Sequence, residues 1–456
     1  MIVMKFGGTS VESAAAIERV AGIVRSRLGL RPLVVVSAMG RTTNRLLAAA
    51  EKAAAGNLGD ALREADELMA FHRREAGALV PEAERHGMES LLERHFSELE
   101  ATLDRIASAG HVTPALWDET ASYGERLSSA LIAMILPAFG VPAVHVDARE
   151  VLVTDSRHTQ ALPLYSRTYA RFKERVAPLL EDHVAVMGGF IGATAEGVTT
   201  TLGRGGSDFS AAIAGAGIGA EEIQIWTDVD GMLTCDPRVL PGGRRVRRIS
   251  FAEAAELAYF GAKVLHPATV QPAIEKNIPV RILNSRRPEV EGTLIVADTV
   301  PCRNPVKSIA CKREITVVEI RSLRMLMAHG FLRRIFEVFD RYQTPVDLVT
   351  TSEVCVAVTV DQTRHIAEIE RELGRISDVH VLPRQAILCL VGDALRETAG
   401  VGARIFSALR GINVRMVSHG ASFNNVSLVV RDEDVTAAVA ALHEEFFREV
   451  DPEVFE

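Results

Sequence analysis

The chain lacks the features that mark secreted, membrane-bound and zinc-stabilised proteins. Its 456 residues include only 5 cysteines, an odd number, and none of them forms a C-x-x-C pair. We therefore expect neither a disulfide framework nor a structural zinc site, and a reducing cytoplasm fits this composition. The N-terminus has no long apolar stretch with a cleavage site, and no apolar run is long enough for a bilayer. These absences predict a cytoplasmic protein without membrane contact.

An excess of positive charge is absent as well. The formal net charge is -8, with 24% charged and 48% hydrophobic residues, which is typical of soluble globular proteins. This balance argues against a nucleic acid as partner. The one basic run, residues 244–248, has no interleaved aromatic side chains, and we interpret it as a solvated loop. A chain of this length predicts roughly three domains.

The first 297 residues have the pattern of an α/β domain with a mostly parallel open sheet. A short apolar strand (2–6) leads through Gly7-Gly8 into a helical pattern (14–28) and then a buried strand (33–37). The charge-rich segment 57–110 predicts two or three inserted amphipathic helices; a solvated helical face is the simpler interpretation. Further strands are predicted at 141–146, 184–187, 198–202, 223–227, 280–283 and 293–296.

Two local signals and a repeat organise the remainder. Ser250 with Glu253 forms a capping box that predicts a helix start, and Gly261 predicts its end. A linker and first strand (298–312) precede two units of the ferredoxin-like β-α-β-β-α-β plan, 313–384 and 385–456. Residues 346–349, a predicted strand of the first unit, correspond to 414–417 of the second.

The Walker A phosphate-binding pattern is missing, but another glycine-rich segment could take its place. Lys5 ends a strand and is followed by Gly7, Gly8 and Ser10, so backbone N–H groups and a helix N-terminus could meet phosphate oxygens. A plain structural turn explains the two glycines equally well.

Two later segments carry similar signals. Residues 200–208 place three glycines at a strand-to-helix junction, where a loop with a capped helix would explain all but Arg204. The guanidinium of Arg204 could grip a carboxylate through two hydrogen bonds. Residues 226–231 and 236–238 follow a buried strand, and either turn chemistry or nucleotide contact explains them.

Together with Gly124-Glu125 and the Phe-Gly-Ala-Lys-Val-Leu-His-Pro segment (260–267), these motifs resemble the aspartokinases of the amino acid kinase superfamily. The resemblance spans nearly the whole chain, and the C-terminal repeat is similar to the tandem ACT domains of the lysine-sensitive type. It implies catalytic roles for Lys5 and Asp208, which would neutralise and orient the transferring phosphoryl group. It also implies substrate contacts by Thr43, Glu125, Arg204 and Ser207. The implied nucleotide contacts are Lys5, Gly7, Gly8, Ser10, Thr227, Asp228, Asp236, Arg238 and Lys263.

The implied cofactors are ATP and Mg²⁺, with no metal held by the protein alone. An aspartate side chain has a pKa of about 4 and is already ionised at neutral pH, so no general base is needed. Two positions depart from some members of that family: Met39 stands where they have a serine that faces the substrate, and Leu233 stands where they have a tyrosine against the nucleotide.

The resemblance also implies an amino-acid effector, lysine first, bound by the first ACT unit. Asp347 would pair with its ammonium group, and the implied effector residues are Met325, Gly330, Phe331, Leu332, Asp347, Thr351, Ser352 and Glu353. Met327 and Ala328 replace polar residues of a lysine-inhibited relative, and Arg415 stands where a second site would need an acid. Alternatively, the repeat only assembles a homodimer or tetramer.

We therefore predict an aspartate kinase that converts ATP and L-aspartate to ADP and 4-phospho-L-aspartate, the first step toward lysine, threonine and methionine. One alternative is a kinase of another small carboxylate, such as an N-acetylated glutamate; Glu125 argues against it, because an acylated amine has no charge to pair. The other alternative is a catalytically inactive amino-acid sensor, although Lys5, Arg204, Asp208 and Lys263 together suit phosphate chemistry better.

Overall fold

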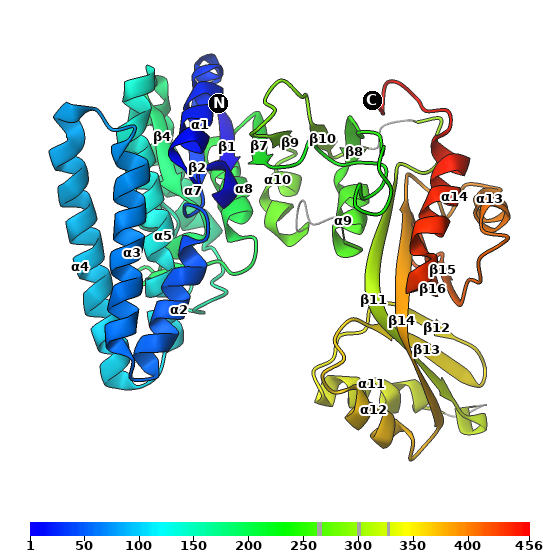
Figure 1. Cartoon of the computed structure of the whole chain (residues 1–456). Helices are drawn as coiled ribbons and strands as arrows, with labels where there is room; N and C mark the ends of the chain where they lie inside the picture. Colours follow the sequence, from blue (N-terminus) through cyan, green and yellow to red (C-terminus); the bar gives the residue numbers. More distant parts are fainter. Residues whose placement is uncertain (262–266, 299–301, 326–328) are drawn as a thin grey trace. The chain divides into compact units, whose positions relative to one another are not determined.

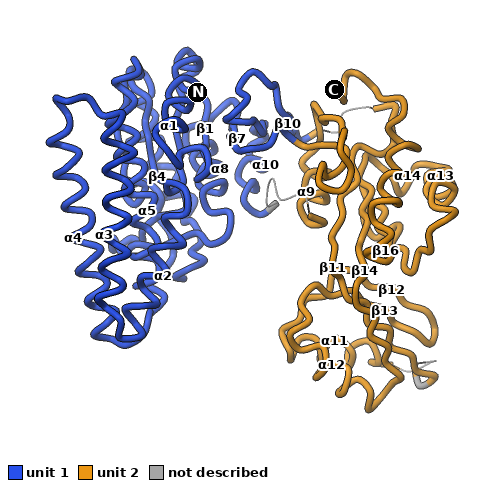
Figure 2. Tube along the Cα trace, viewed as in Figure 1, with its two compact units in different colours: residues 1–231, 265–297 blue, residues 232–264, 298–456 orange. Residues whose placement is uncertain are grey.

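The computed structural model describes residues 1–456 except 262–266, 299–301 and 326–328. The chain divides into two compact units, shown in Figure 2. The first comprises Met1–Gly231 and Leu265–Ala297, and the second comprises Met232–Val264 and Asp298–Glu456. This division differs from the predicted boundary at residue 297, because residues 232–264 pack with the C-terminal half of the chain.

The first unit is built on a mostly parallel sheet in the order β3-β4-β2-β1-β7-β9-β10. Every neighbouring pair is parallel except β9 with β10. The strands are β1 (Ile2–Phe6), β2 (Pro32–Val36), β3 (Ala143–Val146), β4 (Val184–Gly188), β7 (Glu222–Thr227), β9 (Val280–Asn284) and β10 (Thr293–Val296). All residues of β2 and β4 are buried, as the apolar runs predict for strands covered on both faces. The small hairpin of β5 (Ile191–Ala193) and β6 (Thr199–Thr201) stands apart from this sheet.

Helices of the first unit confirm the predicted insertion. They are α1 (Ala14–Arg25), α2 (Thr42–Ala54), α3 (Leu58–Gly77), α4 (Arg85–Ala109), α5 (Pro114–Ile135), α6 (Ala148–Val151), α7 (Tyr165–Arg171), α8 (Gly206–Ile218) and α10 (Gln271–Glu275). Figure 1 shows the inserted helices α3 and α4 lying beside α2 and α5. The insertion is therefore more than a solvated face, because Leu68, Leu92 and Leu103 are buried in the same core as the sheet.

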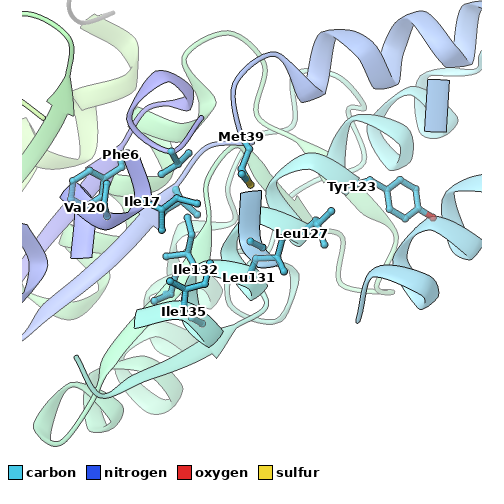
Figure 3. Close-up of a cluster of buried hydrophobic side chains, with 14 of the residues drawn as sticks. Phe6, Ile17, Val20, Met39, Tyr123, Leu127, Leu131, Ile132 and Ile135 are labelled. Atoms are coloured by element: carbon cyan, nitrogen blue, oxygen red, sulfur yellow. The ribbon is translucent and has the colours of Figure 1, made fainter. Parts of the chain in front are cut away.

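The centre of that core lies between β1, α1 and α5. Figure 3 shows Phe6 with Ile17 and Val20 on one side and the α5 side chains Leu127, Leu131, Ile132 and Ile135 on the other. Thr113 caps the N-terminus of α5 and a proline occupies its first turn, so the start of this helix is fixed. The helix is thus a rigid support for the polar side chains that it presents elsewhere.

The second unit carries the antiparallel sheet β12-β13-β11-β14-β16-β15. Its elements are β8 (Arg248–Ser250), α9 (Phe251–Tyr259), β11 (Ser308–Arg321), α11 (Phe331–Arg341), β12 (Val349–Thr351), β13 (Cys355–Val360), α12 (Ile366–Leu373), β14 (Asp378–Val391), α13 (Val401–Ala408), β15 (Met416–His419), β16 (Asn425–Arg431) and α14 (Val435–Phe447). In Figure 1, α11 and α12 lie along one half of the sheet and α13 and α14 along the other.

Two details differ from the predicted repeat. The long strands β11 and β14 run through both repeats, and Ser308–Lys312, predicted to precede the first unit, pairs with residues of the second. The predicted strand at 346–349 starts later, at Val349. The capping box is confirmed, since Ser250 and Glu253 exchange both hydrogen bonds at the start of α9. None of the described helices is long and apolar enough to cross a membrane.

Candidate active site

A polar cavity lies where parallel strands of the first sheet end. Lys5 stands near the end of β1, Ser37 directly follows β2, and Phe190 follows β4. Ligands of open α/β sheets bind at this carboxyl edge. The cavity has a volume of about 310 Å³. It is lined by Lys5, Ser37, Thr43, Glu125, Phe190, Gly203, Gly205, Gly206, Ser207 and Asp208.

Lys5 and Asp208 form an ion pair in this cavity. The Lys5 Nζ atom lies 2.7 Å from Asp208 Oδ1, and the two side chains are only 12% and 16% exposed. Asp208 stands in the first turn of α8, where the N-terminal dipole favours a negative charge. The pair therefore holds an ammonium group rigidly at the cavity wall, in reach of an anionic ligand.

Glu125 presents a carboxyl group with unmet hydrogen-bonding capacity. Its side chain is 4% exposed, and its Oε2 atom has no hydrogen-bond partner among the described residues. Burial raises the pKa of Glu125 to about 8, against the smaller opposing effect of a hydrogen bond from the Ala38 backbone. A cation brought into the cavity would restore the charged form, so this group suits an ammonium ligand.

The glycine-rich segment forms a turn at the other side of the cavity. Gly203 and Gly205 have φ of +76° and +72°, a left-handed conformation that side chains with a Cβ rarely adopt. Both glycines line the cavity, whereas the side chain of Arg204 between them is exposed and lies outside the lining. The structure thus brings Lys5, Thr43, Glu125, Ser207 and Asp208 together and places Arg204 at the rim.

Two cavity residues were missed in the sequence. Ser37 donates a hydrogen bond to Ser207 Oγ at 3.1 Å. Phe190 has φ of +66°, and its backbone N–H donates to Ser210 Oγ at 2.9 Å. The available signal was that Ser37 ends the predicted strand 33–37 and Phe190 follows the predicted strand 184–187, but serine and phenylalanine are ordinary residues at such positions.

The predicted phosphate loop is folded tightly beside this cavity. A Cβ on Gly8 would lie 3.0 Å from the carbonyl oxygen of Gly40 and 3.1 Å from that of Ala38, so a larger residue would have to push this backbone aside. Ser10 is buried, and its hydroxyl shares a 2.8 Å hydrogen bond with Ser285. Gly7, Gly8 and Ser10 are not part of the cavity lining, and the Ser10 side chain faces Ser285 instead.

The remaining predicted nucleotide residues are distributed over both units. Thr227 donates to Asp228 within the first unit at 3.3 Å. Asp236 and Arg238 belong to the second unit, where two parallel hydrogen bonds of 3.0 and 2.6 Å join them. Lys263 lies outside the described residues.

Three other sequence interpretations can be compared with the structure. Met39 is fully buried in the apolar core and contributes nothing to the cavity lining. The carbonyl of Leu233 accepts a hydrogen bond from Ser308 in the second unit. The basic run is not simply a solvated loop, because Arg245 is only 8% exposed and pairs with Glu456. That interpretation was wrong, since pairing with the last residue of the chain cannot be inferred from local composition.

The predicted effector residue Asp347 already has a cationic partner. Lys312 Nζ lies 2.8 Å from both of its carboxylate oxygens and 2.9 Å from Asp361. The Tyr259 hydroxyl donates to Asp347 at 3.4 Å. Burial alone would lower the pKa of Lys312, but the hydrogen bonds that Lys312 donates to these two acids raise it.

The other predicted effector residues frame the same half of the sheet. Gly330, with φ of +76°, precedes α11, where Phe331 is buried and Leu332 is 42% exposed. Met325 is partly buried, and Thr351, Ser352 and Glu353 are exposed at the end of β12. Met327 and Ala328 lie outside the described residues. The backbone of Asp347 donates to Thr359 as that of Arg415 donates to Val429, which supports the predicted equivalence of these positions.

Comparisons with known proteins agree with this architecture. The amino acid kinase family model matches residues 1–284, and an ACT domain model matches residues 388–446. The chain is 38% identical over 468 residues to aspartokinase 2, chloroplastic, of Arabidopsis thaliana, covering 99% of this chain and 85% of that protein. It is also 38% identical over 460 residues to the lysine-sensitive aspartokinase 3 of Escherichia coli K12, covering 98% and 99%.

Solved structures of E. coli aspartokinase III are similar over the full length. The complex of that enzyme with lysine and aspartate, in its T-state, has a TM-score of 0.85 and covers 98% of this chain and 99% of that one. Its complex with aspartate and ADP, in the R-state, has a TM-score of 0.79 and covers 98% and 100%. Both are 38% identical in sequence to this chain.

Proposed function

The chain belongs to the aspartokinases of the amino acid kinase family, and we propose that its cavity binds L-aspartate and directs the γ-phosphoryl group of ATP to the side-chain carboxylate. The product is 4-phospho-L-aspartate, the entry to lysine, threonine and methionine synthesis. The observation that carries this proposal is the buried Glu125 carboxyl, whose Oε2 lacks a partner among the described residues of a cavity that also holds Lys5.

Recognition of the amino acid rests on its two α-groups. Glu125 pairs with the α-ammonium, and the ion pair is strong because little solvent reaches the carboxyl. Arg204, at the rim, turns toward the α-carboxylate and binds it through two parallel hydrogen bonds. Thr43 and Ser207 line the same cavity, and their hydroxyl groups are available to donate hydrogen bonds to the amino acid. Because both α-groups are bound in this way, the side-chain carboxylate remains free to act as the nucleophile.

Phosphoryl transfer then depends on position and charge. The attacking carboxylate is ionised at neutral pH, so no residue has to remove a proton. Lys5 neutralises the negative charge that the transferring group brings near the nucleophile, and Asp208 keeps Lys5 in place at 2.7 Å. Gly7 and Gly8 allow the backbone of the loop to approach phosphate oxygens, and Thr227, Asp228, Asp236, Arg238 and Lys263 remain predicted nucleotide contacts.

The donor set fits a Mg²⁺ ion that arrives with the nucleotide. Mg²⁺ is usually held by one or two carboxylates together with substrate phosphates. Of the two cavity carboxyls, Glu125 faces the amino acid and Asp208 is the one that would hold the ion. When bound, the ion draws charge from the phosphate oxygens and so supports the leaving group.

A hydroxamate assay tests the proposal. Purified protein is mixed with Mg·ATP, L-aspartate and hydroxylamine, which traps an acyl phosphate. We expect aspartyl hydroxamate from L-aspartate and none from N-acetyl-L-aspartate, because the acylated amine cannot pair with Glu125. Equal product from both would contradict the Glu125 role. No product from either, with folded protein, would refute the activity and favour an amino-acid sensor.

We infer that the first ACT unit is the regulatory site and that lysine is its effector. An effector ammonium needs the Asp347 carboxylate, and Lys312 already holds it. Effector binding therefore requires that the ion pair between Lys312 and Asp347 breaks, and the cost of breaking it lowers the affinity for lysine. Pairing of ACT units in a homodimer or tetramer and a cytoplasmic location complete the proposal.

A further inference from the structure

Asp118 is a buried carboxylate for which the proposed chemistry has no use. It lies in the first turns of α5 and is fully inaccessible to solvent. His158 Nδ1 donates to its Oδ2 at 2.7 Å, Thr201 Oγ1 to its Oδ1 at 2.5 Å, and the Thr159 backbone N–H to both oxygens at 3.0 Å. A carboxylate is stable without water only if such hydrogen bonds replace it, so this network is closely fixed.

The donors come from two chain segments that meet behind the Gly203–Gly205 turn. Thr159 has φ of +69°, an unfavourable conformation for threonine, and its N–H is held by Asp118. A Cβ on Gly203 would lie 3.1 Å from the Thr159 carbonyl oxygen, so this segment packs directly against the turn. The Thr201 carbonyl accepts from Ala161 N–H at 2.9 Å, which ties the second segment to the first.

Helix α5 carries both Asp118 and the cavity residue Glu125. Glu125 follows Asp118 by seven residues, two turns of α5, so both carboxyls project from one helix face. Trp117, next to Asp118, packs edge to face on the cavity residue Phe190, with ring centroids 6.5 Å apart. Helix α5 thereby carries Glu125, which meets the amino-acid ammonium. Through Asp118 the same helix also fixes the segment that packs against the Gly203–Gly205 turn, where Arg204 lies.

We propose that Asp118 is a positioning residue that sets the separation between Glu125 and the Gly203–Gly205 turn, and thereby the fit of the two α-groups of the amino acid. This inference rests on the proposed aspartate kinase activity. Asp118 is not part of the cavity lining and acts through the wall on the amino-acid side, so we expect its removal to change amino-acid recognition and to leave nucleotide binding unchanged. A role in stability alone would lower the melting temperature without changing the KM for aspartate.

The test compares Thr201→Val with Thr201→Ser. Valine has the shape of threonine but removes the hydroxyl that donates to Asp118, whereas serine keeps it. We expect Thr201→Val to raise the KM for aspartate about tenfold, the loss typical of one hydrogen bond to a charged group, with kcat and the KM for ATP within twofold. Thr201→Ser should restore the KM for aspartate to within twofold of the wild type.

Thr120→Val serves as the matched control on α5. The Thr120 hydroxyl is fully buried, and among the residues that the structure describes it donates only to the Leu116 carbonyl of its own helix, at 2.7 Å. The Thr120→Val variant should have a lower melting temperature than the wild type and an unchanged KM for aspartate. Asp118→Asn should raise the KM for aspartate more than Thr201→Val does. If Asp118→Asn does not fold, the comparison of Thr201→Val with Thr201→Ser decides the question.

Two outcomes would overturn the inference, and they differ from one another. If the wild type forms aspartyl hydroxamate and Thr201→Val keeps the wild-type KM for aspartate, the positioning role is refuted while the activity stands. If Thr120→Val raises that KM as much as Thr201→Val does, the effect is one of helix stability. Failure of the activity itself appears in the wild-type reaction alone, before any variant is compared.

Discussion

Glu125 should make aspartate binding depend on pH near neutrality, a range in which an exposed carboxyl is already ionised. Its pKa is raised to about 8 because the side chain is buried, so the empty enzyme carries a proton there at neutral pH. An ammonium ligand requires the ionised form, and binding therefore releases that proton. The affinity for aspartate must rise as the pH increases toward 8 and level off between pH 8 and 9, while the α-amine of aspartate is still protonated.

The magnitude follows from the fraction of Glu125 that is ionised. With a pKa of about 8, roughly one molecule in ten is ionised at pH 7 and one in a hundred at pH 6. Each unit below 8 costs about 1.4 kcal/mol of binding, or about tenfold in kcat/KM for aspartate. The same quantity for ATP should lack this slope, because ATP does not meet Glu125.

The assay is a series of hydroxamate or coupled ADP measurements between pH 6 and 9 with either substrate varied. Glu125→Gln should show a high KM for aspartate that no longer changes with pH in this range. A wild-type profile for aspartate that is flat from pH 6 to 8 would refute the reasoning. So would an equal slope for ATP, since that would place the titrating group elsewhere.

Glu125 affects the stability of the folded protein in the opposite direction: a higher pH favours aspartate binding but lowers the stability of the empty enzyme. The raised pKa of Glu125 gives the folded protein extra stability that is fully present below the unfolded value near 4.5 and is lost as the pH rises through about 8. At pH 9 the buried charge costs the empty enzyme several kcal/mol, up to about 5. Glu125→Gln should therefore raise the melting temperature at pH 9 while it abolishes tight aspartate binding.

The remaining predictions concern phosphoryl transfer, substrate binding, regulation and acid stability. Lys5→Met should lower kcat by about two to three orders of magnitude, since the charge on the transferring group loses its partner, and near-wild-type turnover would contradict this role. Arg204→Ala should raise the KM for aspartate at least tenfold with little change in kcat; an unchanged KM would remove it from substrate binding. Lys312→Met should lower the lysine concentration needed for inhibition, because Asp347 is freed, while Arg313→Met, which loses only the pair with Asp432, should not. Burial lowers the pKa of His72 to about 4 and of His95 to about 3, so each contributes stability that is present above pH 6.5 and lost as the pH falls toward these values. At pH 5 each should cost about 2 kcal/mol relative to pH 8, and His95→Phe should unfold at a lower pH than the wild type in an acid titration.

The sequence predicted most of the fold because its signals are local. The apolar strands, the capping box at Ser250 and the charge-rich insertion each depend on residues close in the chain. The boundary between the units was not predictable in this way, because residues 232–264 join the C-terminal half through partners such as Ser422 and Asn425, which bond Glu256. Such pairing over some 170 residues leaves no mark on local composition.

The site shows the same division between local and distant information. Motif resemblance named Lys5, Glu125 and Asp208, and the structure brings all three to one cavity. Phe190 enters that cavity through an unusual backbone conformation, which no residue preference for phenylalanine predicts. The pairing of Asp347 with Lys312 was also missed, because it links Lys312 on β11 to a side chain 35 residues later in the chain, just before β12.

The fully buried pair of Glu253 and Lys307 limits how this protein can be recombined. Glu253 caps α9 in the catalytic part of the sequence, Lys307 precedes the long strand β11, and their charged atoms lie 2.9 Å apart without solvent. A kinase fragment cut near residue 297 would keep the acid and lose the base, which leaves an uncompensated buried charge. Regulatory halves can therefore be exchanged between relatives only together with residues 232–264, so that Glu253 and Lys307 always come from the same parent protein.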